Sequence, residues 1–174
     1  MPRQLVVALV LFSCSPVLDA AEYQGIPRLE NRVTDVANVL TATDRDLLIG
    51  LLARYERETF HQIAVLTVPT LSGETIEAFS RRVTKSWGLG HKGLDNGILI
   101  TLAMKERRVR IELGVGMEKF IPNATAQSII NTLMVPAFRK GDYVGGLKSG
   151  LEQLMKEARR FVITPADLQK AKER

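Results

Sequence analysis

Cysteine and histidine are scarce in this chain of 174 residues, which contains one Cys and two His. Zinc sites in proteins draw most of their ligands from these two residue types, so the composition disfavours one. Cys14 has no second cysteine to pair with, which excludes a disulfide within the chain. We also find no Ser-His-Asp spacing or nucleophile elbow of the kind used for covalent catalysis.

Long hydrophobic runs are missing as well. Leu5 to Phe12 is an unbroken apolar run, but it is too short for the roughly 20 residues that a membrane-spanning helix needs. Arg3 precedes the run, and Leu18-Asp19-Ala20 follows it and ends on a small residue. Residues 1–20 are therefore predicted to be a cleaved signal peptide, with a buried N-terminal strand as the alternative.

Export would place the chain in the periplasm. Lipidation of Cys14 is an alternative to cleavage after Ala20. Leu11-Phe12-Ser13-Cys14 loosely resembles a lipoprotein attachment site, although Phe12 is bulky where a small residue is usual. Lipidation of Cys14 would hold the protein at a membrane, whereas cleavage after Ala20 would leave a mature chain without cysteine. Both outcomes stay open at this point.

Aromatic residues make up only 6% of the chain, and acidic residues are outnumbered, giving a net charge of +5. A basic protein raises the question of nucleic acid. No aromatic side chains are interleaved with the basic clusters, as a single-strand binder would require, and an exported chain rarely meets nucleic acid. A solvated basic face is favoured, with attraction to anionic membrane surfaces as a further option.

The length suits one domain behind a short leader. Residues 21–31 are polar, contain Gly25 and Pro27, and are predicted to be a linker. The folded domain is expected to span residues 32–163, and residues 164–174 to form a charged tail.

Hydrophobic spacing predicts alternating helices and strands in the folded domain. Leu48, Leu52 and Tyr55 belong to an apolar stripe with helical spacing, whereas the run that ends before Pro69 is β-branched. Pro136 is expected to kink the third helix, and Asp142 to cap the fourth. The predicted elements, in chain order, are a helix at 42–59, a strand at 62–68, a helix at 74–86, strands at 97–104 and 109–113, and two helices after residue 123.

This order predicts an α/β fold with a small mixed sheet covered by helices on both faces. Strands joined through a helix should be parallel, and the pair joined at Lys105–Arg107 should be antiparallel. Gly88-Leu-Gly-His-Lys-Gly93 matches a dinucleotide-binding motif by its letters alone. A helix precedes it and a strand follows, which is the reverse of what phosphate binding requires, so we expect no nucleotide here.

Two glycine-containing loops carry acids beside neighbouring strands. Asp95-Asn96-Gly97 precedes one strand, and Gly114-Val-Gly-Met-Glu118 follows the next. Asp35 precedes the first helix, and Asn123 could add an oxygen ligand. Calcium takes six to eight oxygen ligands, so converging loops would suit it. The alternative is that Asp95 lies in an ordinary turn, Asp35 satisfies backbone amides, and Glu118 is an exposed charge.

The remaining polar candidates are two histidines and an arginine cluster. His61 lies at a helix end, where its imidazolium would complement the helix dipole. His91 lies in the glycine loop, either as a surface residue or as an acid or base. Arg107, Arg108 and Arg110 could hold a phosphate, or could simply protect a hairpin edge with charge.

The sequence resembles the TPM domain family, named for its thylakoid, phosphatase and membrane-associated members. The resemblance covers about residues 31–162. The matching segments are Val33-Thr-Asp35, Gln62 to Val68, Ile76-Glu-Ala-Phe79, Trp87-Gly-Leu-Gly90, Asp95 to Ile100, Arg107 to Ile111, Gly114 to Glu118, Pro136 to Arg139 and Gly141-Asp-Tyr143.

The resemblance implies a three-layer α/β/α sandwich, export, and an acidic loop cluster that binds a divalent ion such as calcium. Carried onto this chain, the cluster comprises Asp35, Asp95, Glu118 and Asn123. The family usually has an acid at the position of Asn123, so the site here has lost one negative charge. Many relatives have a C-terminal membrane span and a glycine-rich tail, and this chain has neither.

Three functions follow from the resemblance and the residues. The first is an exported metal-binding interaction module that helps to maintain or assemble membrane proteins through an envelope or membrane protein partner. The second is a metal-dependent acid phosphatase acting on phosphomonoesters. Bare carboxylates repel a phosphate ester, so this activity needs a cation or help from Lys92 and Arg107. The third is a purely structural domain whose acids only cap loops.

Overall fold

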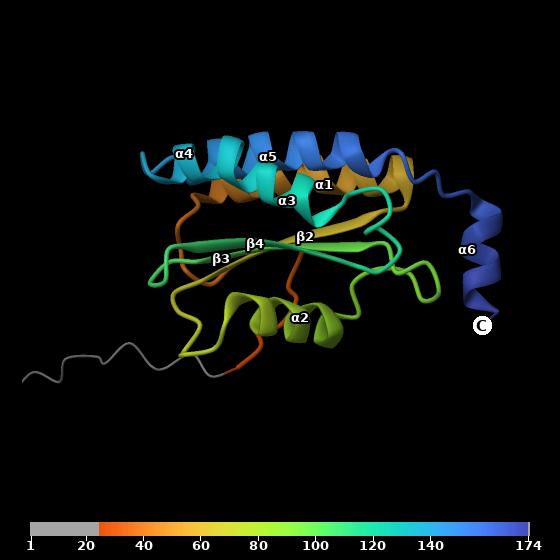
Figure 1. Cartoon of the computed structure of the whole chain (residues 1–174), viewed down its shortest axis with the longest axis horizontal. Helices are drawn as coiled ribbons and strands as arrows, with labels where there is room; N and C mark the ends of the chain where they lie inside the picture. The colour runs from red at the N-terminus through yellow and green to blue at the C-terminus, as the bar shows by residue number, and fades with distance from the viewer. Residues whose placement is uncertain (1–24, 174) are drawn as a thin grey trace, which may run out of the picture.

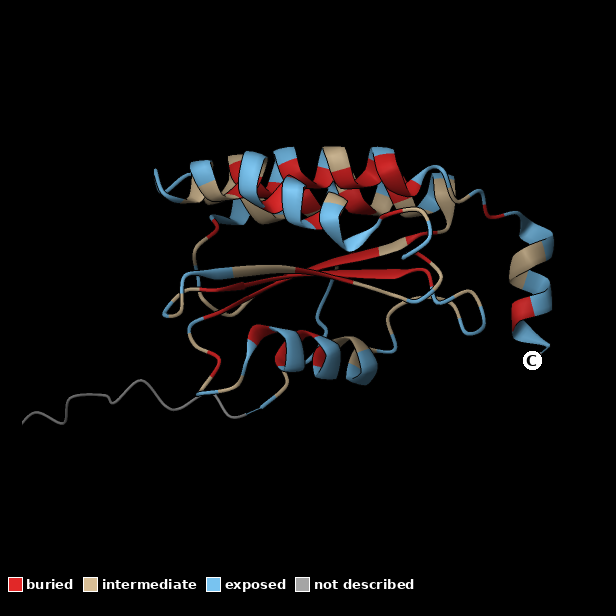
Figure 2. Ribbon diagram, in the orientation of Figure 1, coloured by how far each residue is buried: buried red, intermediate tan, exposed pale blue. Residues whose placement is uncertain are grey.

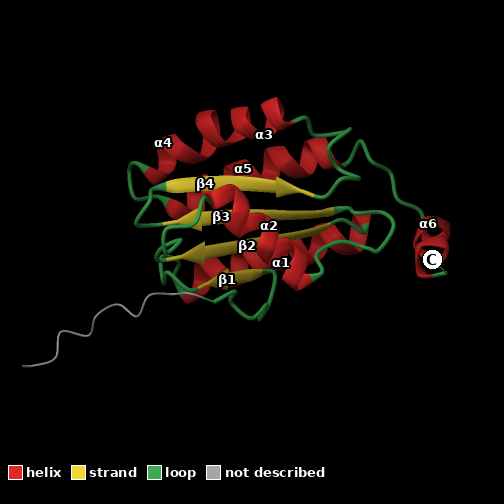
Figure 3. Ribbon diagram, turned by 60° about the horizontal axis from the view of Figure 1, so that its bottom comes forward, coloured by secondary structure: helices red, strands yellow, loops and turns green. Residues whose placement is uncertain are grey.

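A four-stranded sheet forms the centre of the computed structural model, which describes residues 25–173. The strand order is β1-β2-β3-β4, as Figure 3 shows. β1 to β3 are parallel, and β4 runs antiparallel to β3. The pairings expected from the helical and hairpin connections are thus confirmed. The strands are β1 (Val33–Asp35), β2 (Gln62–Val68), β3 (Gly97–Ala103) and β4 (Arg108–Leu113).

Helices cover both faces of the sheet, which confirms the three-layer α/β/α arrangement (Figure 1). α1 (Ala42–Thr59) and α5 (Tyr143–Ala158) lie on one face with α3 (Asn123–Ile129), η1 (Ile130–Met134) and α4 (Val135–Phe138). Of the helices in the described part of the chain, α2 (Ile76–Trp87) is the one that covers the other face. α6 (Pro165–Lys172) stands beside this body. Within the described residues, none of the helices is both long and apolar enough to cross a bilayer.

The alternation of side chains along the strands divides the core into two layers. Ile63, Val65 and Ile100 face the α1–α5 side, whereas Leu66 and Leu99 face α2. Every residue of β3 is buried, as expected for a strand inside a sheet with both faces covered (Figure 2). β4 is an edge strand; Arg108 is exposed, and only Ile111 and Glu112 are buried.

Side-chain caps set the helix starts. Thr41 and Asp44 form a reciprocal capping box that begins α1, and the side chain of Asp142 accepts a hydrogen bond from the Gly145 N–H at the start of α5. Both caps were expected. α1 begins and ends at the predicted residues, whereas α2 begins two residues later than predicted, behind its cap Thr75.

Three elements differ from the expectation. β1 was not predicted, because three residues are too few to show an alternating pattern. The third predicted helix contains a π-helical turn, η1, in which Val135 N–H donates to Ile130 C=O just before Pro136. The segment expected as a charged tail contains α6, which begins with a Thr164–Asp167 capping box. The predicted signal peptide and Cys14 lie outside the described residues.

Candidate functional site

The two glycine loops meet at the end of the sheet where β3 begins. The N–H of Gly114 donates to the Gly97 carbonyl at 2.8 Å, and the N–H of Gly116 donates to the Asp95 carbonyl at 3.2 Å. A Cβ atom at Gly116 would collide with the Leu94 carbonyl oxygen, and one at Gly114 with that of Asp95. Both positions therefore require glycine for the loops to approach this closely.

Asp95, Glu118 and Asn123 line one cavity of about 650 Å³ at this junction. All three are exposed, so their oxygens are open to solvent and to a ligand. Asp95 adopts a left-handed backbone conformation with a φ of 47° within the turn that His91 begins. The turn thus spans residues 91–95 rather than the expected Asp95-Asn96-Gly97, because Asn96 leads into β3 and Gly97 begins it. Asp95, at the end of the turn, supplies the cavity with a carboxylate.

Asn96 fixes the shape of this turn and was not singled out from the sequence. Its side chain is fully buried; Oδ1 accepts a hydrogen bond from the His91 N–H, and Nδ2 donates to the Phe60 carbonyl, both at 2.7 Å. Gln62 Oε1 accepts from the Gly90 N–H at 2.8 Å. The loop is thus tied to β2 and to the end of α1. An asparagine inside a turn motif gave no sign of these long-range contacts.

Basic side chains and a further acid, Glu112, line the same cavity. The guanidinium of Arg110 lies 2.6 Å from the Glu112 carboxylate, and that of Arg81 lies 3.7 Å from it. Lys92, which was expected to assist a phosphate ester, also lines the cavity. Arg107 does not, because it lies in the β3–β4 turn at the far end of the strands.

Asp35 is not part of this cluster. It pairs with Thr67 near the carboxyl end of β2, whereas Asp95 precedes Gly97, which pairs with Gln62 at the opposite end. Five residues of strand separate the two registers, or roughly 16 Å at about 3.3 Å per residue. The Asp35 carboxylate accepts hydrogen bonds from the N–H groups of Val39 and Leu40. The backbone-satisfying role considered from the sequence is therefore the one that the structure shows.

The remaining donor set suits a hard cation held by few protein ligands. Two carboxylates and one amide supply at most about five side-chain oxygens, and calcium takes six to eight ligands in all. Between residues 25 and 173, no group of three or more His, Cys, Asp or Glu side chains is placed to hold a metal ion. Any ion here would need backbone carbonyls or water to complete its shell, so the residues fit an open, weak oxygen site.

The cavity offers little for nucleophilic chemistry. Thr84 lines it, but its hydroxyl donates to the Ser80 carbonyl at 2.9 Å within α2. His91 Nδ1 lies 3.2 Å from Asn96 Oδ1, which orients the ring toward the loop. Among the described lining residues, no hydroxyl or thiol is paired with a general base.

His61 differs from the expectation. It is fully buried, its Nε2 lies 2.8 Å from the Phe161 carbonyl, and its ring packs between Tyr55 and Phe161. Burial lowers the pKa of His61 below its ordinary value, so the imidazole is neutral rather than a cation that complements the helix dipole. The sequence showed the helix end but not that Phe161, in the segment after α5, would cover it.

Comparisons with known protein families and solved structures agree with one another. The model of the TPM domain matches residues 33–157. The N-terminal domain of a protein from P. gingivalis is 33% identical, with a TM-score of 0.66 over 73% of this chain and 81% of that one. The BA42 protein of Bizionia argentinensis is 21% identical, with a TM-score of 0.63 over 74% and 88%, and shows the same fold. No curated protein matches the chain.

Proposed function

The chain belongs to the TPM domain family, and we propose that it is an exported interaction module that binds a divalent cation, calcium first, at the junction of its two glycine loops. Asp95, Glu118 and Asn123 are the proposed ligands. The bound module would act on an envelope or membrane protein partner in membrane-protein maintenance or assembly.

The observation that carries the proposal is the convergence of the two loops. Gly116 N–H bonds to the Asp95 carbonyl, which holds the loop of Asp95 against the loop that leads to Glu118. Loops fixed in this way lose little conformational entropy when an ion binds. Since the lining residues include no paired nucleophile and base, binding is a better-supported use of the cavity than catalysis.

The charges around the cavity set the expected affinity. Asn123 contributes a neutral oxygen, and Lys92 and Arg110 add positive charge nearby. Both features weaken attraction for a cation. Asp35, which is engaged by backbone N–H groups at the other end of the sheet, is not among the proposed ligands.

A calorimetric calcium titration of the full chain tests the proposal. Wild type should bind weakly and saturably, Asp95→Asn should lose binding, and Asn123→Asp should bind about tenfold more tightly because it adds a carboxylate. Asp46→Asn removes an exposed carboxylate from α1, outside the cavity, and should change nothing. Absence of binding in both wild type and Asn123→Asp would overturn the cation site.

The partner half of the proposal has its own test. A tagged chain should recover an envelope protein in the presence of calcium, and Asp95→Asn should recover less of it than Asp46→Asn does. Equal recovery by the two variants would show that partner binding does not depend on the loop cluster, and would contradict this half of the proposal.

The basic side chains of Arg81, Lys85 and Arg110 on the same cavity support a second candidate, a metal-dependent acid phosphatase. A bound divalent ion would polarise the phosphate and reduce its repulsion by the carboxylates. Hydrolysis of a phosphomonoester such as p-nitrophenyl phosphate, with several divalent ions supplied, should then exceed that of Asp95→Asn. Equal rates for the two proteins would exclude this activity.

A further inference from the structure

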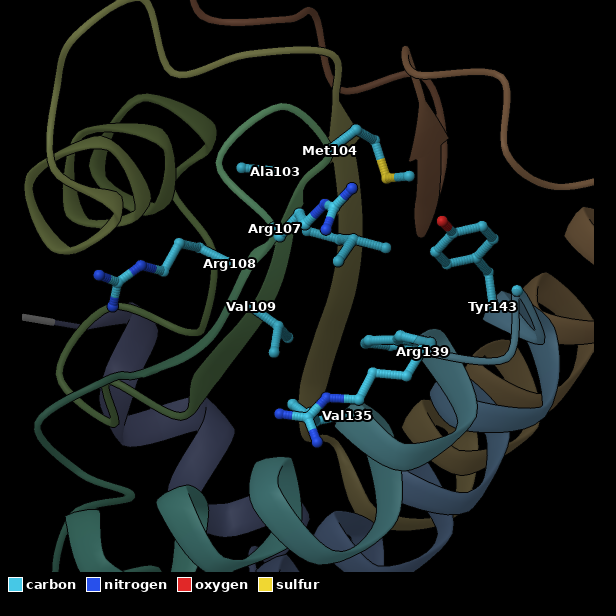
Figure 4. Close-up of a pocket in the computed structure, with 11 residues that line it drawn as sticks. Ala103, Met104, Arg107, Arg108, Val109, Val135, Arg139 and Tyr143 are labelled. Carbon is cyan, nitrogen blue, oxygen red and sulfur yellow. The ribbon is translucent and has the colours of Figure 1, made fainter.

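A second cavity, separate from the loop cluster, opens at the other end of the sheet (Figure 4). Its volume is about 670 Å³, within the range of small-molecule sites. It lies where β3 ends, between the β3–β4 turn and the junction of α4 with α5. The two cavities are separated by the length of β3, so a ligand in one does not contact the other.

The cavity wall is apolar. Val109, Val135 and Phe138 line it, and each is only partly buried although it packs on the main core. Tyr143 closes one side, with its ring 5.8 Å from that of Phe138. Apolar surface left uncovered inside a concave site favours a ligand with an apolar body.

Positive charge surrounds this apolar wall. Arg107 and Arg139 reach around the opening from two different elements, whereas Arg108 points away from it (Figure 4). Within residues 25–173, neither Arg107 nor Arg139 forms a side-chain hydrogen bond or an ion pair, and the Tyr143 hydroxyl also has no hydrogen-bond partner there. Among the described residues that line the cavity, none carries a carboxylate.

The nearest carboxylates along the chain are used elsewhere. Glu106 Oε1 accepts hydrogen bonds from the Thr70 hydroxyl at 2.8 Å and the Leu71 N–H at 3.0 Å. Asp142 accepts from the Gly145 N–H at the start of α5. Neither of these carboxylates forms an ion pair with Arg107 or Arg139, so both guanidinium groups can pair with a ligand.

Both arginines are held by local backbone structure. Arg107 has a φ of 52° at the end of the β3–β4 turn, and Glu106 anchors that turn to the β2–α2 loop. Arg139 is the C-cap of α4, the short helix that begins directly after the π turn. A π turn takes one more residue than an α turn, which changes the side that the following residues present. Such turns occur often at functional sites.

We propose that this cavity binds a small amphipathic anion, in which an apolar chain lies against Val109, Val135 and Phe138 while a carboxylate or phosphate head contacts Arg107 and Arg139. Guanidinium groups pair with both kinds of head through charge-assisted hydrogen bonds. The Tyr143 hydroxyl is placed to donate a further hydrogen bond to the head group.

The test is an NMR titration of the full chain with decanoate and decyl phosphate below their micelle-forming concentrations. Amide shifts should concentrate at residues 102–109 and 135–143 and saturate. Decanol, which lacks charge, and inorganic phosphate, which lacks the chain, should each bind at least about tenfold more weakly. Equal binding of decanol or of phosphate would overturn the proposal.

Variants can distinguish binding in this cavity from a general attraction of anions to a basic protein. The double change Arg107→Gln and Arg139→Gln should weaken decyl phosphate binding about tenfold or more, whereas Arg54→Gln with Arg57→Gln removes the same charge from α1 and should not. Tyr143→Phe should weaken it by less than the arginine pair. Equal loss in both double variants, or response to anionic phospholipid vesicles but not to monomeric amphiphiles, would contradict the site.

Discussion

The carboxylate of Asp35 accepts a hydrogen bond from the hydroxyl of Thr67, which joins β1 to β2 at the carboxyl end of the sheet. The same carboxylate accepts from two backbone N–H groups ahead of α1, and its side chain is 1% exposed. One acid thus holds a three-residue strand, a neighbouring strand and the entry to a helix together.

Removing this acid should destabilise the fold without affecting ion binding. Asp35→Ala leaves the Val39 and Leu40 N–H groups without their acceptor, and we expect it to lower the free energy of unfolding by about 2–4 kcal/mol. Urea denaturation measures the change. Arg45→Gln removes a half-exposed partner 3.7 Å away and should cost less than about 0.5 kcal/mol. Loss of calcium binding by folded Asp35→Ala would contradict the assignment of Asp35 to a purely structural role.

The contact between the glycine loops gives a second prediction. Gly116→Ala places a Cβ against the Leu94 carbonyl, so the loops must separate, at a cost of about 1–3 kcal/mol. Gly50→Ala is the matched control, because no atom lies near its Cβ in the exposed middle of α1. That change should stabilise the protein by about 0.5–1 kcal/mol. The thermal unfolding midpoint should fall for Gly116→Ala and rise for Gly50→Ala. Equal shifts of the two midpoints would argue against the close approach of the loops.

His61 predicts a pH dependence of stability. Burial lowers the pKa of His61 in the folded protein, whereas the unfolded chain binds a proton near the ordinary value of 6.5. Its contribution is therefore fully present above that value and is lost as the pH falls through it toward the lowered pKa. Urea midpoints between pH 7.5 and pH 5 should fall for wild type and for His91→Gln, and should fall less steeply for His61→Gln. Identical slopes for all three proteins would exclude a buried neutral His61.

Tyr55 should lose its proton only at an unusually high pH. Burial raises its pKa to about 12, and its hydroxyl donates to the Met155 carbonyl at 3.0 Å. Absorbance titration at 295 nm should show one tyrosine that ionises well above pH 10 and that is missing in Tyr55→Phe. Since the unfolded chain loses this proton near pH 10, stability should decline as the pH rises from there toward 12. Loss of the hydrogen bond in Tyr55→Phe should cost about 1 kcal/mol.

Much of the fold could be predicted from the sequence because its signals are local. The stripe of α1 repeats over five turns, and the buried run of β2 ends at Pro69, so both elements were placed at their observed bounds. β1 has three residues and α6 only one buried residue, Ala171. Segments with so little periodicity carry no pattern that distinguishes them from a loop.

The candidate site was only partly predictable for a related reason. Asp95 and Glu118 follow glycine-rich signals and lie beside strands that are consecutive in the chain, so their proximity could be expected from the hairpin. Whether Asp35 joins them depends on which end of the sheet it occupies. That follows from the parallel pairing of a strand that the sequence did not reveal.

The sequence by itself determined the layer order, the parallel pairing of β2 with β3, the antiparallel pairing of β3 with β4 and the approach of two acidic loops, because hydrophobic period and turn residues act over a few neighbours. Only the tertiary structure decided the burial of His61 and the separation of Asp35 from Asp95. It alone also brought Arg107 and Arg139 to one cavity. These relations join residues far apart in the chain, and they arise when strand order and helix packing bring distant segments to the same end of the sheet.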